Sequence, residues 1–159
     1  MGFTVHNSKE FIKLYLIDEV KDIVFRHPYL SFVLMAVGIE FLGKCTWTDQ
    51  KEWDVKPEDN NKAFEKGLNL MIEIDQRYAG LDLKNQLRNG FAHTLLPKSE
   101  ISLSEVNAGD EHFGKDFRGR TILVAEIFYR DFVIACKKVL NMQFSESDKM
   151  NKPFMEVGN

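Results

Sequence analysis

An arginine, an asparagine and a histidine lie close together in the segment Leu87–His93, which reads Leu-Arg-Asn-Gly-Phe-Ala-His. On an α-helix, at about 100° per residue, Asn89 and His93 would share a face, and Arg88 would lie beside it. A guanidinium binds phosphate oxygens well, and histidine commonly exchanges a proton near neutral pH. The spacing therefore predicts a site that holds a phosphate and moves a proton. The alternative is three solvated residues on an ordinary helix surface.

The elements that must position this trio are predicted to be helices. Ser8 is a good N-cap for the first helix, and His27-Pro28 ends it because a residue before proline is pushed out of the helical region. The second helix is apolar nearly all round, which is typical of the centre of a bundle. Apolar residues at helical spacing and local stop signals predict five helices, over about 8–27, 28–44, 64–79, 82–95 and 124–142.

A short stretch before the last helix follows a different period. Residues 101–104 alternate apolar and polar, residues 107–110 have turn chemistry, and 118–123 read as a second extended segment. We therefore predict an all-α bundle of about five helices, with a four-helix core and a small β-hairpin-like insert before the last helix. Residues 1–144 are predicted to form this domain. Residues 145–159 turn polar and are predicted to form a flexible C-terminal tail.

The overall charge limits how this chain could bind nucleic acid. The 159 residues carry a formal net charge of −3, so any such contact needs a local basic patch rather than a general positive field. Lys84, Arg118 and Arg120 are the candidate substrate-binding residues. Lys115, Arg118 and Arg120 alternate with Phe113 and Phe117 in a basic and aromatic stretch that could contact a backbone or stack a base. The alternative is an ordinary solvated hairpin.

Cysteine usage and the N-terminal sequence indicate a soluble, cytoplasmic protein. Cys45 and Cys136 lie in apolar contexts and are expected to be buried free thiols in a reducing compartment. We recognise no secretory signal, and the apolar run 29–42 is too short to span a bilayer. His6, His27 and His112 share no metal-ligand spacing with each other or with the cysteines, so no metal and no cofactor are predicted.

The Arg88-Asn89-x-x-x-His93 pattern, within a helical bundle of this size, resembles the HEPN superfamily (higher eukaryotes and prokaryotes nucleotide-binding domain). The family pattern is an arginine, four residues and a histidine, and the first of the four is commonly polar, as Asn89 is. The long apolar helix 29–42, with Gly38 and Glu40, is similar to the central helix of such bundles. The resemblance covers roughly residues 8–143, but its specific part is the segment 87–93.

The resemblance implies a metal-independent endoribonuclease in which the ribose 2′-hydroxyl attacks the neighbouring phosphorus, leaving a cyclic phosphate and a free 5′-hydroxyl. His93 would act as general base or acid, Arg88 would neutralise the phosphorane, and Asn89 would orient the imidazole or the scissile phosphate. It also implies a homodimer with one composite cleft, an RNA substrate and a toxin or defence role restrained by an antitoxin or regulatory protein. Gly90 would allow a second backbone to approach.

Several alternatives remain open at this stage. Arg88 could form a surface ion pair with Asp82 or Asp75, and Asn89-Gly90 could break the fourth helix. Glu40 could reach a basic residue near the site or extend to solvent at a bundle end. The chain could also be a non-catalytic module of the same fold that binds a protein or nucleotide, or an unrelated helical bundle.

Overall fold

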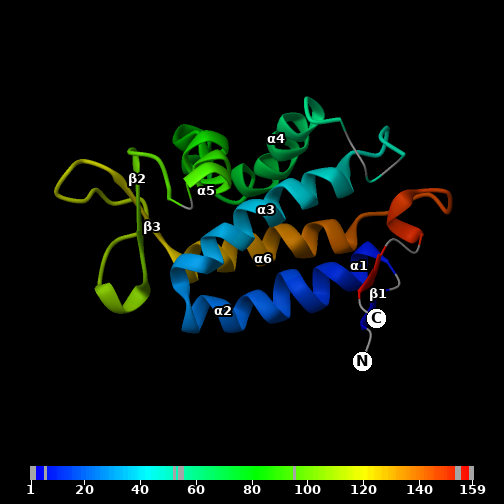
Figure 1. The fold of residues 1–159 in the computed structure, drawn as a ribbon, viewed down its shortest axis with the longest axis horizontal. Coiled ribbons are helices and arrows are strands. Elements are labelled where there is room, and N and C mark those ends of the chain that lie inside the picture. The colour runs from blue at the N-terminus through cyan, green and yellow to red at the C-terminus, as the bar shows by residue number, and fades with distance from the viewer. Residues whose placement is uncertain are drawn as a thin grey trace.

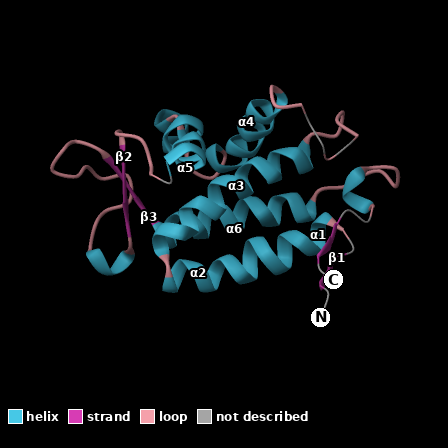
Figure 2. Cartoon of the chain, in the orientation of Figure 1, coloured by secondary structure: helices cyan, strands magenta, loops and turns pink. Residues whose placement is uncertain are grey.

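Helix α3 (Pro28–Thr46) lies at the centre of the fold, between α4 (Asp59–Ile72) and α6 (Ala125–Asn141), as Figure 1 shows. The computed structural model describes residues 3–5, 7–51, 53, 56–94, 96–152 and 155–157. The protein is mostly helical (Figure 2). The apolar sequence of α3 predicts its central position, because a helix that is hydrophobic all round needs neighbours on several sides. Its buried apolar side chains are Phe32, Met35, Ala36, Ile39, Leu42 and Cys45.

The first predicted helix is one continuous helical segment that changes its hydrogen-bond pattern. It consists of α1 (Ser8–Phe11), the π-helix η1 (Ile12–Glu19) and α2 (Val20–Arg26). It ends before Pro28 as predicted, but Asn7 is the N-cap rather than Ser8. The Asn7 Oδ1 atom accepts the Glu10 N–H at 3.1 Å. The Ser8 hydroxyl instead donates to the carbonyl of Met150 at 3.2 Å.

Two glycines allow α3 and α4 to cross in close contact. A Cβ atom on Gly43 would overlap the carbonyl oxygen of Ala63, and one on Gly67 would overlap the carbonyl oxygen of Ile39. Each backbone therefore occupies the space that a side chain of the other helix would fill. This close approach packs the helix that carries Glu40 against the helix that precedes the Arg88 segment.

The third predicted helix is shorter in the structure than its apolar stripe indicates. α4 ends at Ile72, and Tyr78 lies in a separate 3₁₀-helix, η2 (Gln76–Leu81). The Asp75 side chain caps η2 by accepting the Arg77 N–H at 2.9 Å. Tyr78 is nevertheless fully buried, so its predicted place in the core is correct and its predicted helix is wrong.

The β-hairpin predicted for the insert is wrong in topology. Strands β2 (Ile101–Ser104) and β3 (Thr121–Val124) pair in parallel, which requires a long crossover instead of the predicted turn at 107–110. The tight turn lies later, at 116–119, where Gly119 adopts a φ of 77°. There residues 113–114 form antiparallel hydrogen bonds with Ile122. The sheet stands at one end of the helices (Figure 1).

The boundary predicted at residue 144 does not separate a domain from a flexible tail. Asp148, Lys149 and Met150 are buried against the bundle. The Lys149 ammonium donates to the carbonyls of Trp47, at 2.7 Å, and Gln50, just beyond the end of α3. Strand β4 (Met155–Val157) pairs antiparallel with β1 (Phe3–Val5). Polar composition suggested solvation here, whereas the lysine and Met150 fasten the segment to the bundle.

α3 is the one helix in the described parts of the chain that is long and apolar enough to cross a membrane. α3 has 19 residues and is therefore longer than the apolar run 29–42, which is too short to span a bilayer. Half of its apolar stretch is buried inside the bundle, and the core helix of a soluble protein has the same length and composition. A single helix of this kind is weak evidence for a membrane protein.

Candidate functional site

The predicted trio lies on the helical segment formed by η3 (Lys84–Asn89) and α5 (Gly90–Thr94). η3 is a π-helix, which is wider than an α-helix. π-helices are rare in proteins, and those that occur are frequently found at functional sites. The chain stays helical at Gly90, with φ −57° and ψ −54°, so Asn89-Gly90 does not break the helix. The predicted end at Leu95 falls on a residue outside the described part of the chain.

Glu40 on α3 holds the Arg88 side chain. The Arg88 Nε atom donates to Glu40 Oε2 at 2.8 Å, and Arg88 Nη1 donates to Asn89 Oδ1 at 3.1 Å. The Glu40 and Arg88 side chains are 14% and 27% exposed, so the ion pair is partly shielded from water. Of the two interpretations of Glu40, the contact with a basic residue near the site is correct. Arg88 is thereby held in one orientation from two sides.

A line of polar side chains continues from Arg88 toward the start of the helix. Asn89 Nδ2 donates to Asn85 Oδ1 at 2.9 Å, and Asn85 Nδ2 donates to Asp82 Oδ2 at 2.8 Å. Asp82 therefore contacts the site only through two amides and does not pair with Arg88. Asn89 is fixed in the middle of this line, and its amide orientation is set by both neighbours.

Asp75, the other acid considered for Arg88, belongs to a different contact. Its carboxylate accepts hydrogen bonds from the Arg77 Nε and Nη2 atoms at 3.0 and 2.7 Å. The bonds from Arg77 lower the pKa of Asp75 to about 2. The alternative that Arg88 pairs with Asp75 is therefore excluded, since Asp75 bonds to Arg77 and Arg88 to Glu40.

His93 lies on α5 one turn after Asn89, and its side chain is exposed. Within the described residues, no hydrogen bond or ion pair joins it to Arg88, Asn89 or another side chain. The imidazole is therefore accessible to a substrate, and it follows Asn89 by four residues along the helical segment.

Gly90 makes room for another segment of its own chain. A Cβ atom there would lie 2.5 Å from the carbonyl oxygen of Leu96 and 3.2 Å from the Lys98 nitrogen. The backbone that approaches Gly90 is therefore that of residues 96–98. The interpretation that Gly90 makes room for a second subunit is corrected accordingly.

A small pocket opens beside the ion pair. It has a volume of about 220 Å³, and Glu40 and Arg88 line it together with five apolar side chains, Val33, Ala36, Val37, Phe91 and Ala92. A low-polarity wall strengthens the electrostatic interaction of a guanidinium with an anion. Arg88 is thus placed at an edge between apolar surface and solvent.

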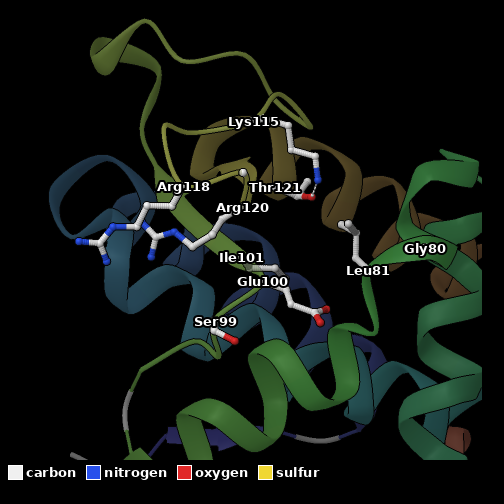
Figure 3. A pocket seen from close by; sticks show the side chains of 10 residues that line it. Gly80, Leu81, Ser99, Glu100, Ile101, Lys115, Arg118, Arg120 and Thr121 are labelled. Carbon is white, nitrogen blue, oxygen red and sulfur yellow. Dashed lines mark hydrogen bonds between the residues drawn. The ribbon is translucent and has the colours of Figure 1, made fainter.

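The predicted substrate-binding residues do not form one group with the trio. Lys84 lies 3.6 Å from Glu65 of α4. Arg118 and Arg120 line a second pocket of about 360 Å³, together with Lys115 and Glu100 (Figure 3). Gln86 connects the two regions, since its side chain bonds to both the backbone nitrogen and the carboxylate of Glu100 at 3.2 Å.

The sequence analysis missed a buried polar network that holds the insert against α6. The Val124 N–H donates to His112 Nδ1 at 2.9 Å, so the proton of the neutral ring is on Nε2, which lies 3.2 Å from the Tyr78 hydroxyl. That hydroxyl donates to Asp131 Oδ2 at 2.8 Å. Burial lowers the pKa of His112 to about 4 and raises that of Tyr78. Asp131, a buried acid on the apolar face of α6, was the available sequence signal.

Cys45 and Cys136 are buried free thiols, as predicted, and burial raises the pKa of both. In the part of the chain that the structure describes, no three His, Cys, Asp or Glu side chains come together as metal ligands would. His6 lies outside that part. No family model matches the chain, and no curated protein or solved structure matches it significantly. Arguments about its function therefore depend on its own residues.

Proposed function

We propose that this protein is a HEPN-like, metal-independent endoribonuclease of the cytoplasm, of the toxin or defence type, restrained by an antitoxin or regulatory protein. One observation carries the proposal. The Arg88 guanidinium is held by Glu40 and Asn89, and among the described residues its Nη2 atom has no partner. His93 follows on the same helix, exposed and one turn beyond Asn89. A fixed cation and an accessible imidazole are what phosphodiester cleavage requires.

The proposed reaction assigns a role to each residue. The ribose 2′-oxygen bonds to phosphorus while the bond from phosphorus to the 5′-oxygen breaks, giving a 2′,3′-cyclic phosphate and a 5′-hydroxyl. His93 takes the proton of the 2′-hydroxyl or supplies the proton that the 5′-oxygen receives. Arg88 stabilises the added negative charge on the phosphorane oxygens through its free Nη2 atom. Asn89 orients the guanidinium, because its Oδ1 atom accepts a hydrogen bond from Arg88 Nη1.

A second copy of the chain would supply the other proton-transfer group. Leu30, Leu34 and Val37 follow each other along α3 at helical spacing and are 54%, 39% and 61% exposed. Val37 also lines the pocket beside Arg88. An apolar stripe next to the site supports a homodimer, because covering it would bring two Arg88 and His93 sets toward one interface.

The test is RNA cleavage by the purified protein in excess EDTA. Wild-type protein should leave cyclic phosphate ends, and His93→Ala and Arg88→Ala should lose the activity. Both variants should remain folded at the assay temperature, with Arg88→Ala somewhat less stable because it loses the ion pair with Glu40. His27→Ala and Arg26→Ala are matched controls, since both side chains are exposed and lie far along the chain from the trio. Loss of activity in the controls would show that the assay responds to charge or folding in general.

The ion pair also favours a second function, a non-catalytic module that binds a protein or nucleotide partner. Glu40 neutralises Arg88 and thereby reduces the attraction of this surface for a phosphate. If the module interpretation holds, wild-type protein forms a stable dimer, cleaves no RNA in a panel of structured and unstructured molecules, and keeps its partner when His93 is replaced by alanine.

A further inference from the structure

The insert tip, residues 116–120, projects an unburied aromatic ring. Phe117 is 89% exposed, the highest value among the large apolar side chains that the structure describes. The Arg118 guanidinium lies 5.2 Å from the centre of its ring and covers one side of it. The remaining ring surface is open to solvent and is available for stacking.

The backbone of the insert tip is held rigidly in this position. Asp116 Oδ1 accepts the N–H groups of Arg118 and Arg120, both at 2.9 Å, and Asp116 Oδ2 accepts Arg120 Nε at 2.7 Å. The Gly119 N–H closes the turn on the carbonyl of Asp116 at 2.9 Å. The backbone at Phe117 therefore does not need to be ordered when a ligand binds, which reduces the entropic cost of binding.

The Arg118 guanidinium lies against the ring, and Arg120 follows two residues later; both groups have free donors. Within the Arg120 guanidinium, only Nε is bonded to Asp116. The Arg118 side chain has no hydrogen bond to another described residue. Both guanidinium groups point to the same side in Figure 3, whereas the Glu100 carboxylate points away from them. They line the same pocket of about 360 Å³, a size typical of a small ligand site.

We infer that the insert tip binds single-stranded nucleic acid, with an unpaired base stacked on Phe117 and the adjoining phosphate on Arg118 and Arg120. An aromatic platform with flanking arginines is the combination that recognises single strands, because every base has a face to stack and every nucleotide a phosphate. A duplex does not satisfy it, since its bases are already stacked. The inference extends the proposed function, for which this strand is RNA, by giving the substrate an anchor outside the Arg88 region.

Binding is measured by fluorescence anisotropy with a labelled oligouridine of about 12 nucleotides, using the His93→Ala protein in EDTA so that the probe stays intact. Phe117→Ala should weaken binding roughly tenfold, and Phe117→Trp should restore it. Arg118→Gln should weaken binding and reduce the slope of log K against log salt by about 0.7. Phe25→Ala is the matched control, because Phe25 is 66% exposed on α2.

Three results would overturn the inference: equal binding of a duplex, an equal loss in Phe25→Ala, or Phe117-dependent binding of anionic phosphatidylserine vesicles without binding of the oligonucleotide. Unfolding midpoints confirm that each variant is folded. The cleavage assay remains a separate readout. Phe117-dependent binding without cleavage by wild-type protein contradicts the ribonuclease proposal alone, and cleavage without Phe117-dependent binding contradicts the anchor alone.

Discussion

The contact between Glu40 and Arg88 determines how the candidate site can act. An arginine without a carboxylate would bind phosphate more strongly, but its long side chain would be free to move. Glu40 offsets part of the positive charge of Arg88, but its hydrogen bond to Nε restricts the guanidinium and leaves Nη2 without a partner among the described residues. A hydrogen-bond donor that is already fixed in place stabilises the charge of the transition state without having to be reoriented during the reaction.

We predict that the ion pair couples α3 to η3. Because both side chains are partly buried, Glu40→Gln and Arg88→Gln should each lower the free energy of unfolding by about 1 kcal/mol, and the double variant should lose less than the sum. Urea unfolding of the four proteins gives the coupling energy. The exposed pair Lys138 and Glu73 is the control and should couple weakly. Equal coupling in the two pairs would contradict the assignment.

The buried His112 predicts a pH dependence of stability. The pKa of His112 is about 4 in the folded protein and 6.5 in the unfolded chain, so between these values only the unfolded chain takes up the proton. Stability is therefore full above about pH 6.5 and falls as the pH is lowered, by about 3 kcal/mol in total at pH 4.

Urea unfolding between pH 7.5 and 4.5 measures this dependence. His112→Asn keeps an acceptor for the Val124 N–H and should be less stable but respond less to pH. An unchanged slope in that variant would show that other groups cause the pH dependence.

Individual contacts could be predicted from the sequence only where a residue type was unusual for its position. Glu40 stood out as an acid in the most apolar helix, and its partner was found in the structure. Asn7 and Asp116 were not singled out, because local side-chain bonds to the backbone depend on the exact φ and ψ values. The network of Tyr78, His112 and Asp131 joins three segments distant in sequence, and no local period reveals it.

At the scale of elements, the helices were predictable and the pairing of the insert was not. Four of the five predicted helices lie close to their predicted ranges, because apolar periodicity reports the face that each helix buries. The third, predicted over 64–79, instead spans Asp59–Ile72. Alternation identifies Ile101–Ser104 as a strand but says nothing about the direction of its partner. The C-terminal segment was predicted to be a flexible tail because its composition is polar. That composition does not reveal the contact of Lys149 with the carbonyl of Trp47, which holds the segment against the bundle.

The crossing of α3 and α4 gives a prediction at this scale. Gly43→Ala should lower the free energy of unfolding by about 2 kcal/mol or more, because the added Cβ overlaps the Ala63 carbonyl and forces the helices apart. Gly80→Ala is the control, since nothing lies within 4 Å of a Cβ there, and it should change stability by about 0.5 kcal/mol at most. A smaller effect at Gly43 than at Gly80 would contradict the close crossing.

For the whole molecule, the apolar stripe on α3 predicts self-association through the face that carries Arg88. Val37→Lys should convert a dimer to a monomer in light scattering after size-exclusion chromatography, because a charge would be buried in the interface. Val106→Lys tests the specificity, as Val106 is 55% exposed on the insert and should leave the dimer intact. A dimer that survives Val37→Lys would place the interface elsewhere.

The measurement that tests the central claim most directly is RNA cleavage in excess EDTA by wild-type protein, His93→Ala and His27→Ala. We predict products with cyclic phosphate ends, a rate lowered roughly a hundredfold or more in His93→Ala, and an unchanged rate in His27→Ala. Cleavage that is equal in all three proteins, or no cleavage by wild-type protein, would contradict it.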